Sequence, residues 1–99
     1  MKTLPMDVNT ALMLDGNAAG GMLNEIFSTE MTTSPTQCAH CGRHGELGSL
    51  QAFMHGSGAV LRCPACESVI MRIVQTPEFT YLDLRGATFL RLDRAVLNR

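Results

Sequence analysis

Cys38-Ala39-His40-Cys41 and Cys63-Pro64-Ala65-Cys66 are the two stretches of this sequence that decide its fold. They form a C-x2-C-x21-C-x2-C pattern, and paired cysteines with similar spacing are typical of zinc sites. Two intervening residues let one tight turn present both sulfurs to the same ion, and zinc accepts four thiolates tetrahedrally at about 2.3 Å. We therefore predict one structural zinc ion, bound by Cys38, Cys41, Cys63 and Cys66.

The residues around the cysteines favour two such turns joined by a β-hairpin. Gly42 follows the first pair, where a positive φ is convenient, and Pro64 fixes φ inside the second pair. The 21 residues between the pairs are enough for an antiparallel hairpin that returns to the same ion. Cysteine pairs at the ends of strands are typical of a zinc ribbon.

Three other uses of the four cysteines stay open. Two disulfides would need an oxidising compartment, a thiol redox centre would suit a thioredoxin-like βαβ unit, and an iron–sulfur cluster also takes four thiolates. Asp7 and Asp15 interrupt any apolar export signal near the start, so we expect a cytoplasmic protein with reduced thiols. Spacing alone does not separate zinc from an iron–sulfur cluster.

Histidines and arginines lie close to the cysteines in the sequence. Because four thiolates complete the zinc shell, we expect His40, His44 and His55 to be surface residues, or at most donors to the site. Arg43 and Arg62 flank the cysteines, and they would offset the negative zinc–thiolate cluster or contact a phosphate. Two arginines do not make a basic patch, which favours the first role.

The rest of the chain predicts one helix followed by short strands. Apolar residues recur at helical steps within 15–31, with Asp15 or Asn17 as the first cap, although Gly20 and Gly21 make this helix dependent on packing. Beyond residue 38 we predict a ribbon and sheet over 38–92, with a turn at His55–Gly58. The predicted strands cover 47–54, 59–62, 68–75, 79–84 and 88–92.

The predicted organisation is therefore a flexible N-terminal arm at 1–14, a domain at 15–92 and a tail at 93–99. Its fold class is a small, mainly-β, zinc-ribbon-like domain of antiparallel strands with an N-terminal α-helix. A chain of 99 residues suits one domain, and a core this small usually needs a staple such as a metal.

Composition argues against several classes of function. The formal net charge is −1, and four zinc-bound thiolates leave no strong basic field, which weakens nucleic-acid binding. No apolar run of membrane-spanning length occurs. No sequence context marks a nucleophile elbow or a phosphate-binding loop, and a closed zinc shell leaves no position for an activated water, so we expect no enzyme.

Five short motifs together resemble a family of short bacterial proteins catalogued only as a domain of unknown function. They are Asp15-Gly16-Asn17-Ala18, Glu25-Ile26-Phe27, Cys38-Ala39-His40-Cys41-Gly42, Val60-Leu61-Arg62-Cys63-Pro64-Ala65-Cys66 and Leu82-Asp83-Leu84-Arg85-Gly86. The resemblance covers roughly Asp15 to Leu92 and implies a zinc-ribbon-like fold with an N-terminal helix. It implies no activity. This chain departs from the family in its longer arm and tail, and in Tyr81, where a tryptophan is usual.

Our preferred hypothesis is a noncatalytic structural-zinc module that binds a macromolecular partner, in the first place a protein. A homodimer is one way to cover the apolar stripe of the helix. The alternative is a transcription-related ribbon that binds nucleic acid through Arg43, Arg62, Arg72 and Arg85, with Phe53 or Tyr81 as stacking surfaces. A thiol redox or iron–sulfur role ranks third. The residues indicate no pathway.

Overall fold

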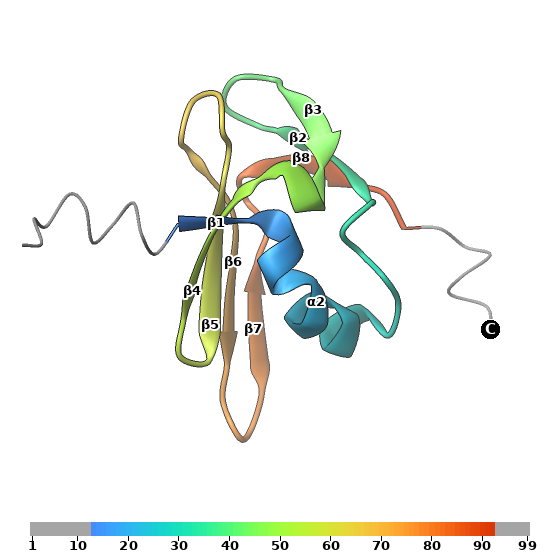
Figure 1. Ribbon diagram of the computed structural model, residues 1–99, viewed down its shortest axis with the longest axis vertical. Coiled ribbons are helices and arrows are strands. Elements are labelled where there is room, and N and C mark those ends of the chain that lie inside the picture. The colour runs from blue at the N-terminus through green and yellow to red at the C-terminus, as the bar shows by residue number, and fades with distance from the viewer. Residues whose placement is uncertain (1–12, 93–99) are drawn as a thin grey trace, which may run out of the picture.

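The computed structural model describes residues 13–92, in which antiparallel strands form two sheets beside one short α-helix (Figure 1). This confirms the predicted mainly-β class with an N-terminal helix. The predicted tail and residues 1–12 of the predicted arm lie outside the described residues. Met13 and Leu14, which we assigned to the arm, belong instead to the first strand.

Five strands form the larger sheet, here called sheet A, in the order β1-β4-β5-β6-β7. Each pairs antiparallel with its neighbour, and the β4–β5 hairpin turns at residues 55–58 as predicted, with Gly56 at φ 56°. The strands predicted at 59–62, 68–75 and 79–84 all lie in this sheet, within one or two residues at each end. Its strands are β1 (Met13–Asp15), β4 (Gln51–His55), β5 (Gly58–Arg62), β6 (Val69–Gln75) and β7 (Thr80–Asp83).

Three short strands form a second sheet, sheet B, in the order β3-β2-β8. Its strands are β2 (Pro35–Cys38), β3 (His44–Glu46) and β8 (Ala87–Leu90). The predicted strand at 88–92 is therefore present as β8. The chain passes from β7 in sheet A to β8 in sheet B, where β8 pairs antiparallel with β2. Thr36 lies opposite Leu90, and the buried Thr36 hydroxyl donates to the Phe89 carbonyl at 2.8 Å.

The strand predicted at 47–54 begins four residues late. Leu47–Ser49 forms a 3-10 turn, η2, and the paired strand begins only at Gln51. The Leu47 and Gly48 N–H groups donate to the carbonyls of Ser34 and Thr32, at 3.0 and 2.8 Å. Because their hydrogen bonds go to the preceding linker, these residues have no strand partner.

The predicted helix at 15–31 is shorter than expected. Asp15 caps it by accepting the Asn17 N–H at 3.1 Å, and a 3-10 turn, η1 (Gly16–Ala19), leads into α2 (Gly20–Phe27). The helix ends at Ser28, which adopts a left-handed conformation with φ 58° and donates its N–H to the Asn24 carbonyl. This reversal brings Met31 into the core, where it is fully buried.

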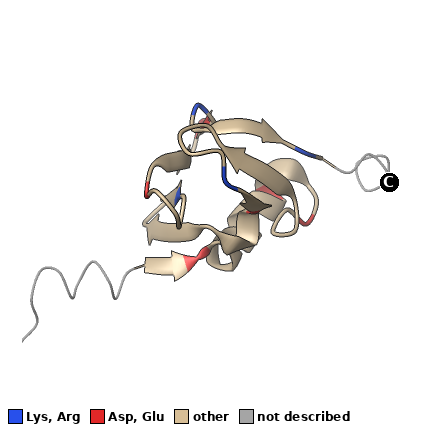
Figure 2. Cartoon of the chain, turned by 90° about the horizontal axis from the view of Figure 1, so that it is seen from above, with Lys and Arg blue, Asp and Glu red and all other residues tan. Residues whose placement is uncertain are grey.

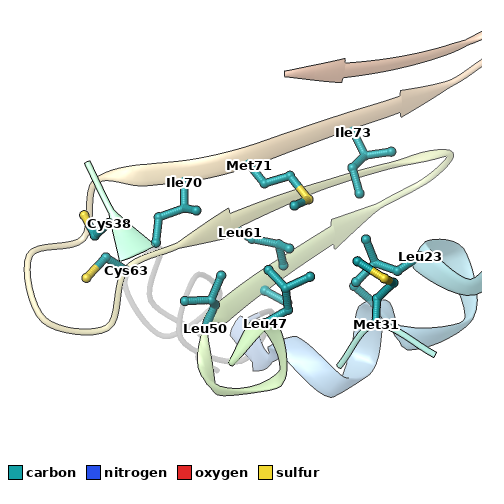
Figure 3. Close-up of a cluster of buried hydrophobic side chains, with 12 residues drawn as sticks. Leu23, Met31, Cys38, Leu47, Leu50, Leu61, Cys63, Ile70, Met71 and Ile73 are labelled. Carbon is teal, nitrogen blue, oxygen red and sulfur yellow. The ribbon is translucent and has the colours of Figure 1, made fainter. Parts of the chain in front are cut away.

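The core lies between sheet A, α2 and sheet B. Leu23 of α2 is fully buried, and other helix residues pack against the same cluster, so the apolar stripe of the helix is covered by its own chain. In Figure 3 the buried side chains run from Leu23 and Met31 at one end to Cys38 and Cys63 at the other. One end of the core therefore consists of cysteine side chains.

No helix among residues 13–92 has the length and apolar character needed to cross a membrane.

Candidate metal centre

The two cysteine pairs come from different sheets and meet at one point. Cys38 and Cys41 lie where β2 turns toward β3, and Cys63 and Cys66 lie between β5 and β6. All four sulfurs lie within 4.8 Å of one another, with Cys38–Cys66 at 3.7 Å and Cys41–Cys63 at 3.6 Å. Bonds of about 2.3 Å in a tetrahedral zinc site give sulfur–sulfur distances of about 3.8 Å. The donor set and its spacing therefore fit a single metal ion.

The two cysteine turns have the same backbone geometry. In the first turn, the Gly42 N–H donates to the Cys38 carbonyl and the Cys38 N–H to the Arg43 carbonyl, both at 2.9 Å. In the second, Glu67 donates to the Cys63 carbonyl at 2.8 Å and Cys63 donates to the Ser68 carbonyl at 2.9 Å. The residue after each second cysteine has a positive φ, 82° at Gly42 and 67° at Glu67. Each turn is thus held in shape by its own backbone.

Backbone N–H groups in both turns also point at sulfur. His40 donates to the Cys38 sulfur and Ala65 to the Cys63 sulfur, each at 3.4 Å, and Cys41 donates to the Cys38 sulfur at 3.5 Å. These contacts orient the sulfur of the first cysteine of each pair relative to its turn.

A β-bulge lies beside each turn. The register of β2 against β8 shifts between Gln37 and Cys38, and that of β5 against β6 shifts between Leu61 and Arg62, next to Cys63. Bulges bend a strand and redirect the following side chain. The extra residue at each shift lies on the partner strand, Thr88 on β8 and Ile70 on β6, so these strands bend beside the cysteine turns.

Burial differs between the two members of each pair. Cys38 and Cys63 are fully buried in the core, whereas Cys41 is exposed and Cys66 is partly buried. The cysteine cluster thus has a dry side continuous with the core and a side that faces solvent. A metal ion there would be bound on one side by the two buried sulfurs and would remain accessible to a chelator on the other side.

A family model matches residues 8–95 of this sequence, which is most of the chain. It describes a family of unknown function, DUF6510. The chain belongs to this family. No curated protein and no solved structure matches the chain significantly. The resemblance to an uncharacterised family is therefore confirmed.

The cysteine pKa values in this DUF6510 chain move in opposite directions. The Ser68 hydroxyl and then its N–H donate to Cys66 and lower the pKa of that thiol to about 6. The Arg43 N–H favours the Cys41 thiolate, but burial and the neighbouring thiols outweigh it and raise the pKa of Cys41 to about 11. The neighbouring thiols therefore raise the pKa of Cys41 but help to lower that of Cys66. A bound divalent cation would favour the thiolate form of its ligands.

Three of the four arginines named for nucleic-acid binding, Arg43, Arg62 and Arg85, contact other groups of the same chain. Arg62 donates to the Glu67 carbonyl at 3.0 Å and lies over the Phe53 ring at 5.7 Å, and Arg43 lies 3.5 Å from the Ser49 hydroxyl. Arg85 forms a 2.7 Å ion pair with Asp83, which lies opposite Arg72 across the β6–β7 pair. Basic and acidic positions are interspersed in the described part of the chain (Figure 2). These contacts argue against a basic face for nucleic acid.

The three histidines do not enter the cysteine cluster. His40, His44 and His55 are exposed, and the His44 ring lies 5.8 Å from that of Phe89 on β8. Sequence reasoning missed the second half of each turn. The carbonyls of Arg43 and Ser68, each two residues after the second cysteine of a pair, accept the N–H of the first cysteine of that pair. The equal spacing of these residues from Cys41 and Cys66 was the available signal.

Gly42 and Glu67 have the same positive-φ conformation, so exchanging glycine for a residue with a side chain, or the reverse, should change the free energy of unfolding in opposite directions. Glu67→Gly should stabilise the fold by about 0.5–1 kcal/mol, because a left-handed backbone costs side-chain-bearing residues more than glycine. Gly42→Ala should cost about 1–2 kcal/mol for the same reason. A Cβ at Gly42 has room, since its nearest neighbour is Gln37 Nε2 at 3.8 Å. Urea unfolding of both zinc-loaded variants measures the difference, and equal effects would contradict the interpretation.

Proposed function

We propose that this chain is a noncatalytic cytoplasmic module in which Cys38, Cys41, Cys63 and Cys66 bind one structural zinc ion, and that the module binds another protein. The observation that supports this most is the meeting of cysteines from two separate sheets within 4.8 Å. A metal ion there would link sheet A to sheet B. That link matters because a core of this size supplies little stability of its own.

The spacing of the sulfurs favours a single ion over an iron–sulfur cluster. A cluster contains several irons and bridging sulfides, so thiolates on its different irons must lie on opposite sides of a larger object. Four sulfurs within 4.8 Å leave room for one ion. Zinc is favoured over a lone iron because it is typical of closed sites made of four cysteines and carries no redox chemistry. Its role here would be structural.

Support for a protein partner comes from the surface. Several large apolar side chains are exposed, with Phe79 at 58% and Tyr81 at 55% the most exposed. Contiguous exposed apolar groups typically mark interaction sites. The arginines required for the nucleic-acid alternative mostly contact groups of their own chain.

Native mass spectrometry combined with alkylation tests the metal assignment. We expect one zinc per chain and no reaction of the four cysteines with iodoacetamide until a strong chelator is added, because metal-bound thiolates are protected. After chelation, all four should react. Two bound irons with sulfide would contradict the zinc assignment, and rapid alkylation of a single cysteine with zinc retained would support a redox role instead.

A further inference from the structure

Strand β7 forms an open edge of sheet A. It pairs with β6 on one side, and on its other side the described part of the chain supplies no strand. Edge strands usually carry lysine, proline or outward charges that prevent pairing with another chain. β7 has neither lysine nor proline, and its only charged residue, Asp83, is held by its own Arg85 at 2.7 Å. Within the described residues, β7 therefore carries neither of the blocking residues and no outward charge that is unpaired.

Aromatic side chains cluster along the same edge. Tyr81 lies opposite Val74 on β6, and both are exposed, at 55% and 40%. Phe79, two residues before Tyr81, is 58% exposed. Since side chains alternate along a strand, Tyr81 and Asp83 share one face, while Leu82 points to the other and packs against the core. The edge thus presents an apolar surface beside free backbone groups.

The hydrogen-bond pattern shows which backbone groups are free. The Thr76 N–H donates to the Phe79 carbonyl at 2.8 Å, so Phe79 pairs toward β6. In an antiparallel ladder every second residue points its N–H and C=O to the same side. Tyr81 and Asp83 therefore also pair toward β6, and Thr80 and Leu82 direct their N–H and C=O groups to the open side.

We propose that β7 pairs antiparallel with β7 of a second copy of this chain, with Thr80 of each copy opposite Leu82 of the other. A two-fold axis then passes beside Tyr81, so the two Tyr81 side chains become a directly opposed pair on the same face. The two copies form one continuous sheet that joins sheet A of each. This rests on the proposed function, because the metal-linked fold positions β7, and it makes the protein partner a second copy.

Charge along the edge favours a second copy over an unrelated peptide. Glu78 precedes β7 and Arg85 follows it, and both side chains are exposed, Arg85 by 86% despite its ion pair with Asp83. Antiparallel self-pairing brings Glu78 of each copy close to Arg85 of the other, at both ends of the interface. Parallel pairing would place like charges together. A guanidinium has five N–H donors, so Arg85 has donors left for a second carboxylate.

Sedimentation velocity over a range of concentrations tests the dimer, with zinc content measured for every sample. The wild-type protein should self-associate reversibly. Tyr81→Lys should raise the dissociation constant about tenfold or more, because it places two like charges directly opposite each other. Leu14→Lys, at an exposed residue of the opposite edge strand β1, is the matched control and should leave the constant unchanged.

A charge exchange makes the geometry specific. Glu78→Arg alone and Arg85→Glu alone should each weaken self-association, because each brings like charges together twice. An equimolar mixture of these two variants should form a heterodimer, since both ends then carry opposite charges.

A zinc-loaded wild-type protein that stays monomeric at the highest attainable concentration would overturn the dimer and leave the zinc module standing. A dimer that Leu14→Lys disrupts and Tyr81→Lys does not would overturn β7 as the interface. A mixture of the charge variants that fails to associate would overturn the antiparallel register.

Discussion

Replacing Cys63 by serine is expected to abolish folding of the domain, leaving neither a cooperative thermal transition nor the β-type circular dichroism of the wild type. Apparent zinc binding energies of about 10–16 kcal/mol in small zinc domains match or exceed the roughly 5–15 kcal/mol that separates most folded proteins from their unfolded state. Cys63 is also fully buried, so the serine hydroxyl would be placed in the core.

A matched control lies in the same turn. Ala65 is exposed, and it contributes to the cluster through its backbone N–H on the Cys63 sulfur, which a serine side chain leaves in place. Ala65→Ser should therefore bind zinc and melt like the wild type. A cooperative melt of Cys63→Ser without bound metal would show that the core folds unaided and would refute the structural role of the ion.

Gly86→Ala is expected to destabilise the protein by about 3 kcal/mol or more, which is the upper range for inserting a methyl group into a packed interior. A Cβ at Gly86 would overlap the Val69 carbonyl oxygen and lie 2.6 Å from Ile70 Cα. These are backbone atoms of β6 and cannot move aside as a side chain could. The Gly86 carbonyl also accepts the Ala39 N–H at 2.8 Å, so the disturbance reaches the first cysteine turn.

Gly21→Ala is the control for the same chemical change. A Cβ at Gly21 meets nothing within 4 Å, and the residue lies in α2, where alanine is favoured over glycine by about 1 kcal/mol. This variant should therefore gain stability. Guanidinium unfolding of both zinc-loaded variants measures the contrast. Similar midpoints for Gly86→Ala and the wild type would show that the β6 contact is not tight.

The sequence predicted the parts of the structure that depend on neighbouring residues. Both cysteine turns, the positive φ at Gly42, the cap at Asp15 and the turn at 55–58 arise from short segments whose chemistry is visible in the residues. The meeting of the two pairs also followed, because a single ion is the simplest way for four reduced cysteines to be satisfied. That these four residues bind the ion remains a prediction.

What depends on distant pairing was not predictable. Thr36 pairs with Leu90 across more than half of the chain, and no local pattern in either segment indicates the other. The same holds for Leu47 and Gly48, whose hydrogen bonds to the linker override the strand preference of the segment. The helix stripe indicated a surface in need of cover, but not that the same chain supplies the cover.

The order of elements along the chain has a consequence for biosynthesis. During synthesis, all four cysteines are outside the ribosome once residue 66 has emerged. Strand β8 completes sheet B, and it begins only at Ala87. Metal capture therefore does not have to wait for the last strand. A nascent chain truncated before residue 87 contains every thiol of the centre but lacks the strand that pairs with β2.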